Sequence, residues 1–192
     1  MMLQSKYLTE KDLSNFGFKK LGSNIKISSD ARIYGPENIT LGNNVRIDDF
    51  AILSAVTGSI EINNYVQICR NSHLSGTLGI KMMDFSSMGA NVVVYAGGDD
   101  YSGSYLTNQI IPKKYTTTVG GPVEIGKHVI IGASSTIIGG AKIGEGSSIG
   151  AMTLIIKDLE EWGIYAGVPA KRLRDRKKDL LKLENKFFNE NK

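Results

Sequence analysis

A six-residue periodicity between Val123 and Ile156 constrains the fold of this chain more than any other feature. Isoleucine recurs at positions 125, 131, 137, 143, 149 and 155, and glycine follows it at positions 126, 132, 144 and 150. A period of six matches neither the 3.6-residue turn of an α-helix nor the alternation of one long strand. It indicates a repeat protein, in which each repeat covers the apolar surface that its neighbour leaves exposed.

Six-residue repeats predict a coil with flat walls. In each hexad a short strand points its aliphatic residue inward, where it stacks on the equivalent residues of the turns above and below. The glycine is expected to adopt a turn conformation that a side chain would hinder. Three hexads close one triangular turn, so we expect a parallel β-helix.

The same spacing continues upstream in groups of three aliphatic residues. We expect each group to form one coil, with bulges at the corners where the frame shifts between groups. The predicted coils begin near residues 23, 41, 62, 82, 125 and 143. The groups upstream of the regular hexads are Ile27, Ile33 and Ile39; Leu41, Ile47 and Leu53; Ile62, Ile68 and Leu74; and Met82, Met88 and Val94.

Residues 1–20 are expected to form a cap on the open end of the β-helix, which is assigned to residues 21–172. Thr9 is a good helix N-cap, Asp12 lies three residues later, and Gly17 is a stop signal. These residues predict a short helix over residues 10–16. Its expected role is to cover the apolar end of the coil, as the terminal caps of repeat proteins do.

A second helix is predicted at the end of the chain, within residues 173–192. Leu173, Leu180, Leu183 and Phe187 would fall on one face of a helix over residues 173–190. We expect that face to pack against the coil or against a neighbouring subunit.

The periodicity is lost between Ala96 and Gly121, so residues 97–121 are predicted to form a long arm. A loop of this length in a compact fold is usually functional or disordered. Tyr101, Tyr105 and Tyr115 supply apolar material, from which we expect an ordered arm with packing of its own.

Composition indicates one globular domain: of the 192 residues, 41% are hydrophobic and 22% are charged. The single Cys69, the lack of an apolar run of membrane-spanning length and the lack of a signal-peptide core predict a cytoplasmic protein. The net charge of +4 is concentrated within residues 171–178, which favours a local anion site over a nucleic-acid surface. Two distant histidines and one cysteine give no metal-binding signature.

The hexads, the arm and the exit segment AGVPAK at residues 166–171 together resemble the hexapeptide-repeat acyltransferases. The resemblance implies a left-handed β-helix that uses acetyl-CoA without a metal and works as a homotrimer with sites between coils. Within the family it is strongest to enzymes that acetylate nucleotide-linked amino sugars, including the anthrose-pathway N-acyltransferase, on residues 43–54, 95–103 and 128–134. This implies transfer of acetyl to the amine of a dTDP-linked amino-deoxy sugar for O-antigen or other surface polysaccharide.

The same resemblance places a coenzyme A site. Ala133 and Ala151 would expose backbone groups to the pantetheine arm, which a larger side chain would block. Ile156, Lys157 and Pro169 occupy further contact positions. Lys171 and Arg174 match cations that meet the phosphates of coenzyme A, a role that suits flexible cationic side chains at a surface rim.

The position of the catalytic base departs from the pattern of the related galactoside and maltose O-acetyltransferases. In those enzymes a histidine lies five residues after the last aliphatic residue before the arm; here that residue is Val94 and the position is Asp99. A neutral amine is already a good nucleophile and needs only a proton acceptor, which a carboxylate can supply. Asp99 is therefore the predicted base, with His73 as the alternative base and a turn-capping role for Asp99 as the alternative interpretation.

The acceptor is expected to meet polar groups near the arm and on the second coil. We expect Asp84, Asn91 and Tyr95 to lie within reach of Asp99, whereas His128 is expected to face solvent at a corner. The full set of acceptor candidates is Arg46, Asp48, Asp49, Asp84, Asn91 and Tyr95.

Two other functions remain open at this stage: an O-acetyltransferase acting on a sugar or polysaccharide hydroxyl, and a non-catalytic trimeric scaffold. The length of the acyl group is open as well.

Overall fold

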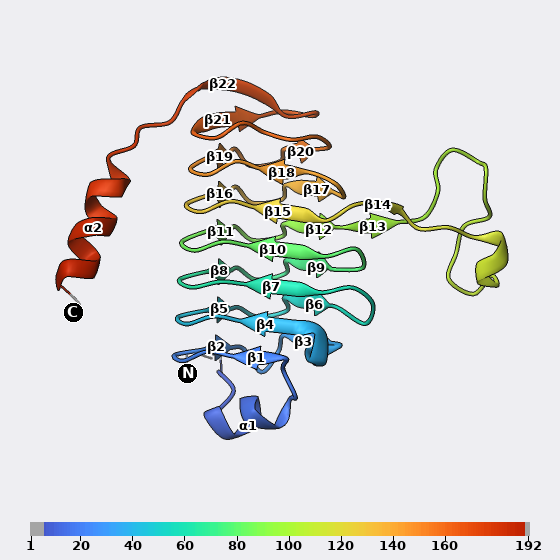
Figure 1. Cartoon of the computed structure of the whole chain (residues 1–192), viewed down its shortest axis with the longest axis horizontal. Helices are drawn as coiled ribbons and strands as arrows, with labels where there is room; N and C mark the ends of the chain where they lie inside the picture. Colours follow the sequence, from blue (N-terminus) through green and yellow to red (C-terminus); the bar gives the residue numbers. More distant parts are fainter. Residues whose placement is uncertain (1–5, 191–192) are drawn as a thin grey trace, which may run out of the picture.

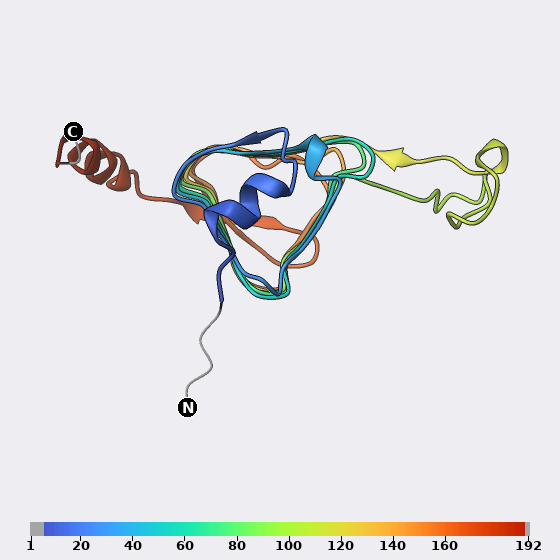
Figure 2. The ribbon, with the colours of Figure 1, turned by 90° about the horizontal axis from the view of Figure 1, so that it is seen from below.

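The computed structural model describes residues 6–190 as a parallel β-helix with a triangular cross-section. Each turn gives one short strand to each of three walls, so the strands of successive turns stack in parallel sheets (Figures 1 and 2). We call the walls first, second and third in the order in which the chain meets them. The first corner joins the first and second walls, the second corner joins the second and third, and the third corner leads into the next turn.

The strands of the three walls are short and follow one another in rotation until the last two, which both belong to the second wall. The first wall contains β1 (Lys20–Leu21), β4 (Ile39–Leu41), β7 (Ile60–Ile62), β10 (Ile80–Met82), β15 (Val123–Ile125) and β18 (Lys142–Ile143). The second wall contains β2 (Lys26–Ile27), β5 (Arg46–Ile47), β8 (Gln67–Ile68), β11 (Ser87–Met88), β16 (Ile130–Ile131), β19 (Ser148–Ile149), β21 (Gly163–Ala166) and β22 (Lys171–Asp175). The third wall contains β3 (Arg32–Tyr34), β6 (Ile52–Ser54), β9 (His73–Ser75), β12 (Val93–Tyr95), β17 (Thr136–Ile138) and β20 (Leu154–Ile155).

Columns of aliphatic side chains fill the centre of the coil, which confirms the inward position predicted from the hexads. On the first wall Leu41 aligns with Ile62, and Ile62 with Met82. Above the arm the column continues through Ile125 and Ile143. These side chains are fully or almost fully buried. Each is expected to contribute about 1.5–3 kcal/mol to the stability of the fold.

The predicted assignment of residues to coils is wrong at its start. The first turn begins at β1 rather than near residue 23, and Ile39 lies in β4 of the second turn rather than closing the first. Strands of the first wall carry two inward residues two positions apart, such as Ile39 and Leu41. Because the first-wall strands bury two residues, the six-residue spacing of aliphatic residues appeared to shift between groups. The spacing from Ile33 to Ile39 is not a spacing within one turn, because it crosses the third corner through η1 (Pro36–Asn38).

The glycines of the hexads serve a different purpose from the one predicted. The left-handed backbone conformation falls two residues later, at His128, Ser134, Gly146 and Met152. Gly132 is required because a Cβ there would overlap the backbone nitrogen of Ala151 in the next turn. The repeat therefore demands glycine for close approach of successive turns.

Residues in the left-handed conformation at the first corner form a stacked column. The Tyr65 and Phe85 rings stack with centroids 4.8 Å apart, and the Phe85 and His128 rings stack at 5.2 Å. His128 is only 8% exposed, so the expectation that it faces solvent is wrong. The flat rings stack from turn to turn, and the C-terminal helix covers them.

The N-terminal cap has the predicted helix, α1 (Glu10–Asn15). The Thr9 hydroxyl accepts from the Asp12 amide at 3.2 Å, and the Asp12 carboxylate accepts from the Thr9 amide at 2.9 Å. This reciprocal pair is a capping box. Leu13 of this helix is buried against the end of the coil, and Gly17 follows with φ +76°.

The arm leaves the coil at the third corner, after β12, and extends away from it (Figure 2). Its root is an antiparallel pair, β13 (Gly97–Gly98) with β14 (Val119–Gly120), and its far part contains η2 (Lys113–Tyr115). Tyr101 is 97% exposed, so the expectation of packing within the arm is wrong for this side chain. Tyr105 and Tyr115 are also about half exposed, so the aromatic side chains of the arm make few contacts with the rest of the arm.

The chain ends in a strand and then a helix, α2 (Leu180–Glu190), so the helix predicted from residue 173 begins later than expected. Leu173 lies in β22 and is 64% exposed. β22 pairs antiparallel with β21, which turns the residues after the exit segment into an edge strand. The spacing from Leu173 to Leu180 suggested a helix that the strand pairing overrides.

Helix α2 lies along the first corner. Glu184 contacts Nζ of Lys127 at 2.6 Å and Nε2 of His128 at 2.9 Å. Phe188 lies edge-on to the Tyr65 and Phe85 rings, with centroids 6.1 and 5.7 Å away. The helix thus packs against the coil as predicted, but through Glu184, Phe187 and Phe188, whereas Leu183 of the predicted face is 66% exposed.

Acid is expected to loosen this helix. Burial raises the pKa of Glu184, but hydrogen bonds from Lys127 and His128 and their charges outweigh it, so the pKa lies below its ordinary value of 4.5. A lowered carboxyl pKa stabilises the folded form above its unfolded pKa, and that stabilisation is lost as the pH falls through the folded pKa. Acrylamide quenching of Trp162, the only tryptophan, reports on this region because Lys178 covers its ring at 5.0 Å.

In the native sequence we expect quenching of Trp162 to rise as the pH falls below about 4.5. In Glu184→Gln it should be raised already at pH 7 and change less over the same range. The far-ultraviolet circular dichroism of the strands controls for global unfolding. Identical pH profiles in the two proteins would contradict the role given to Glu184.

Candidate active site

A shallow groove of about 300 Å³ runs across the outer face of the second wall, over β8, β11, β16 and β19. Its lining combines glycines with residues that carry aliphatic or polar side chains. The lining residues are Gln67, Cys69, Ser87, Met88, Gly89, Ile130, Ile131, Gly132, Ser148 and Ile149.

A column of small residues follows the groove upward from turn to turn. Gly89, Gly132, Gly150 and Ala166 directly follow or end the strands of the second wall in successive turns. A Cβ on Gly89 would lie 2.8 Å from the nitrogen of Ala133, so no side chain fits between these turns. Four strands at the usual spacing make this column about 14 Å long.

Ala133 and Ala151 lie beside the column, at the second corner. Both are exposed, and the Met152 amide donates to the Ala133 carbonyl at 2.9 Å, which places one above the other. Methyl side chains on the rim leave the neighbouring backbone accessible. The column was not predicted as a feature of the site, because Gly132 and Gly150 were expected to be turn residues and Gly89 lies outside the regular hexads.

Two cationic side chains lie in the strand that ends the second wall above the groove. Lys171 pairs with Ala166 and Arg174 with Ile164 in the edge strand β22, and both cations are exposed. Pro169 lies just before them, in the turn that joins β21 to β22, where the Ala170 amide donates to the Leu154 carbonyl at 2.8 Å.

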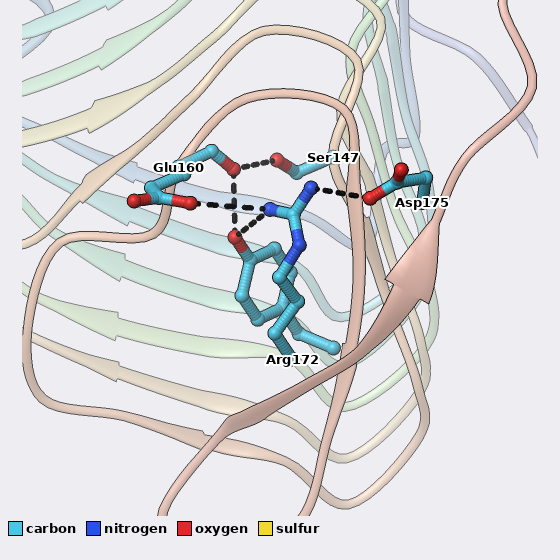
Figure 3. A network of polar contacts seen from close by, with 5 residues as sticks. Ser147, Glu160, Arg172 and Asp175 are labelled. Carbon is cyan, nitrogen blue, oxygen red and sulfur yellow. Dashed lines mark hydrogen bonds and ion pairs between the residues drawn. The ribbon is translucent and has the colours of Figure 1, made fainter.

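Arg172 secures the middle of this edge strand (Figure 3). Its guanidinium donates to the Tyr165 hydroxyl and to Asp175, both at 2.8 Å, and lies 3.5 Å from the Glu160 carboxylate. The Tyr165 hydroxyl in turn donates to the Glu160 carbonyl at 2.9 Å. Arg172 thus has a structural role between the two exposed cations.

The lower end of the groove meets polar residues of the second and third turns. Arg46 donates to Asp48 at 2.6 Å, and Gln67 donates to the same carboxylate at 3.4 Å. Burial, followed by the charge of Asp48, raises the pKa of the Cys69 thiol. The thiol therefore stays protonated near neutral pH, where it is a poor nucleophile.

Asp49 and Asn91 belong to the second corner. Ser28 donates to Asp49 at 2.5 Å. The backbone amide of Asn71 donates to the Asp49 carbonyl, and that of Asn91 donates to the Arg70 carbonyl, so this corner is stacked from turn to turn. Arg46, Asp48, Asp49 and Asn91 thus form one group around the lower groove.

A second group of candidates lies on the outer face of the third wall and at the third corner. The His73 and Tyr95 rings meet edge-on with centroids 5.5 Å apart. Burial lowers the pKa of His73, so its imidazole is neutral at physiological pH and can accept a proton. Ile156 and Lys157 follow β20 at the third corner, above Tyr95 and Ile138 in the stacked turns.

Asp99 lies at the root of the arm, directly after β13. Its Oδ2 accepts from the Asn108 amide at 3.2 Å. The neighbouring Asp100 caps the turn instead: its carboxylate accepts from the amides of Ser102, Ser104 and Tyr105 at 2.9–3.1 Å. These hydrogen bonds, led by the one from the Ser102 amide, lower the pKa of Asp100. The turn-capping role considered for Asp99 therefore belongs to Asp100.

Asp84 joins neither group, so the expectation that it lies near Asp99 is wrong. It lies at the first corner, where its Oδ1 accepts from the Asn64 amide at 2.8 Å and from the Asn64 side chain at 3.1 Å. Asn43 and Asn64 repeat this contact in the turns below. Asp84 thus ends a ladder of side chains that ties the turns together.

Within residues 6–190, no three or more His, Cys, Asp or Glu side chains gather where they could hold a metal ion. The helices in the same range lack the length and apolar character of a membrane span.

Comparison with known proteins identifies the family. Residues 122–157 match the model described as bacterial transferase hexapeptide (six repeats). The chain is 41% identical, over 94% of each sequence, to dTDP-4-amino-4,6-dideoxy-D-glucose acyltransferase of Escherichia coli.

Two solved structures of AntD, an N-acyltransferase from Bacillus cereus, share the fold of the chain. A Ser-to-Cys variant of AntD in complex with dTDP-4-amino-4,6-dideoxyglucose and coenzyme A superposes with a TM-score of 0.93 and 41% identity, over 98% of this chain and 100% of that one. AntD with dTDP and 3-hydroxybutyryl-CoA gives a TM-score of 0.92 and 40% identity, over 97% and 98%. The chain therefore belongs to the hexapeptide-repeat acyltransferase family and is an acyl-CoA-dependent acyltransferase.

Proposed function

We propose that the chain transfers an acetyl group from acetyl-CoA to the amine of a dTDP-linked amino-deoxy sugar destined for O-antigen or another surface polysaccharide. The observation that carries this proposal is the match of nearly the whole chain to AntD in complex with a dTDP-amino sugar and coenzyme A. We place the enzyme in the cytoplasm, with the single Cys69 as the supporting feature.

The groove of the second wall suits coenzyme A. Lys171 and Arg174 above its upper end would meet the phosphates, and the exposed alanines at the second corner would leave the backbone open to the pantetheine arm. The column of small residues is about 14 Å long, roughly the reach of an extended pantetheine. The thioester would then lie near Gly89, at the level of the turn from which the arm leaves.

The proposed reaction is a direct transfer. The amine nitrogen attacks the thioester carbonyl carbon, a C–N bond forms and the C–S bond breaks. The Asp99 carboxylate accepts the proton that the amine loses, and the leaving sulfur of coenzyme A takes up a proton. Among the described residues Asp99 has one protein hydrogen-bond donor, so its other carboxylate oxygen can receive a substrate proton.

A homotrimer would complete this site. The candidates for coenzyme A divide between the second wall with its second corner and the third corner. The acceptor candidates other than Asp84 divide between the second corner and the outer face of the third wall. The second and third corners lie at opposite ends of the third wall. A second corner that faces the third corner of a neighbouring subunit would join the two groups. The exposed arm, with Tyr101 at its start, supplies apolar surface for such a contact.

Release of free thiol from acetyl-CoA, measured with a panel of acceptors, tests this function. We expect turnover with dTDP-4-amino-4,6-dideoxyglucose and at most weak turnover with dTDP-6-deoxyglucose, which differs only in having a hydroxyl in place of the amine. A parallel series with 3-hydroxybutyryl-CoA measures the preference for the acyl group. Turnover only with hydroxyl acceptors would favour an O-acetyltransferase, and neither turnover nor coenzyme A binding would favour a scaffold.

A further inference from the structure

Arg176 makes an unusually complete set of contacts for a residue just beyond the end of a strand. Its Nη1 lies 2.8 Å from the His128 carbonyl, 3.1 Å from the Gly146 carbonyl and 3.3 Å from the Ser147 carbonyl. Its backbone amide donates to the Trp162 carbonyl at 2.8 Å. The side chain therefore ties the end of β22 to two turns of the coil at the first corner.

This position matters because β22 is an edge strand of the second wall. All five of its residues are exposed, and it pairs on one side only, with β21. Its register with β21 shifts between Ile164 and Tyr165, within the part of the strand that leads to Arg174. The half of the strand that carries Arg174 pairs with Ile164 and Gly163 of β21, and Arg172 contacts Asp175. Arg176 adds the side-chain contacts that join this half to the turns below β21.

Helix α2 continues the same attachment. Lys178 covers the Trp162 ring at 5.0 Å, and Glu184 pairs with Lys127 and His128. We call Arg176, Lys178 and Glu184 the C-terminal anchor. Its contacts lie along the first corner, at the opposite edge of the second wall from Lys171 and the exposed alanines.

We propose that Arg176 is a positioning residue for acyl-CoA: by anchoring β22 it holds Arg174, and to a lesser degree Lys171, where the phosphates of the donor bind. The inference rests on the proposed placement of these phosphates at the upper end of the groove. Arg176 itself is not a phosphate ligand, because its guanidinium is occupied by backbone carbonyls at another corner.

Two donors separate this role from general stabilisation. Acetyl-CoA carries the phosphates, whereas S-acetyl-pantetheine has the same thioester and lacks them. In Arg176→Gln we expect the KM for acetyl-CoA to rise about tenfold with kcat little changed, since hydrogen bonds from a charged group are lost. The KM for S-acetyl-pantetheine should stay the same. Lys177→Gln, which removes the same charge from an exposed neighbour, is the matched control and should resemble the native enzyme.

A double-mutant cycle tests the path through Arg174. If Arg176 acts by holding Arg174, adding Arg176→Gln to Arg174→Ala should raise the KM for acetyl-CoA little further, whereas independent contributions would multiply. Arg176→Lys should restore part of the affinity. Glu184→Gln, a milder change in the same anchor, should raise the KM for acetyl-CoA by about two- to threefold and serves if Arg176→Gln does not fold.

The outcomes distinguish this inference from the proposed function. A native enzyme with equal KM values for the two donors would overturn the phosphate site and the role of Arg176 together. A native enzyme that prefers acetyl-CoA, with Arg176→Gln and Glu184→Gln variants that prefer it equally, would overturn only the role of Arg176. Equal losses with both donors would likewise show a general structural effect and overturn it.

Discussion

Asp99→Asn is expected to lower kcat by about 10²–10⁴-fold, the usual contribution of a general base. Asparagine keeps the shape of the side chain and can still accept from the Asn108 amide, so the arm should keep its conformation. The carboxylate is proposed to contact the amine of the acceptor and not coenzyme A. The Kd for coenzyme A should therefore change by less than about twofold. Single-turnover kinetics and calorimetric titration with coenzyme A give the two quantities.

The competing base is His73, whose lowered pKa leaves it neutral and able to accept a proton. His73→Asn should therefore be compared directly with Asp99→Asn. Near-normal turnover in Asp99→Asn together with a large loss in His73→Asn would transfer the role to the histidine. Asp30→Asn, at an exposed position of the first turn, controls for removal of one negative charge.

Ala151→Leu is expected to weaken binding of coenzyme A by on the order of 100-fold, because a leucine side chain would fill the path of the pantetheine arm. Ala151 is exposed at the second corner, so the fold should accept the larger side chain. Calorimetric titration measures the affinity, and the thermal unfolding midpoint checks the fold. Val56→Leu, at an exposed site of the second turn, is the control. Unchanged affinity in Ala151→Leu would place the donor elsewhere.

The coil could be predicted because its repeat is a direct consequence of its packing. One inward aliphatic residue per hexad must align with the next turn, and pairs such as Ile131 with Ile149 do so. The details of the frame could not be predicted, because the first wall buries two residues per strand, as in Ile60 and Ile62. Period-two burial within a strand and period-six burial along the coil are superimposed in one sequence.

Long-range contacts explain the errors at the first corner and the C-terminus. From its place at a corner, His128 was expected to face solvent. In the structure α2 covers it and Glu184, 56 residues later in the chain, pairs with it. Leu173 has suitable spacing for a helix, yet β21 offers an edge with which residues 171–175 pair instead. Local propensity is a weak guide where a distant segment supplies or demands a partner.

The positions of some candidate residues in the fold could be predicted, whereas those of others could not. Motif spacing placed Asp99 at the root of the arm and Lys171 and Arg174 in the strand above the groove. Spacing could not reveal that Asp84 belongs to a ladder at another corner, because residues close in sequence separate onto different corners of a triangular turn. Nor could it show why Gly89 and Gly132 lack side chains, since this depends on the approach of the following turn.

The most direct test of the account is the linkage in the product. Acetyl-CoA labelled with ¹³C at the carbonyl, incubated with the enzyme and dTDP-4-amino-4,6-dideoxyglucose, should give a sugar nucleotide whose labelled carbonyl couples to the amide proton in nuclear magnetic resonance spectra. A mass increase equal to one acetyl group should accompany it. A labelled ester on a sugar hydroxyl, or recovery of the unmodified amine after coenzyme A has been shown to bind, would contradict the account.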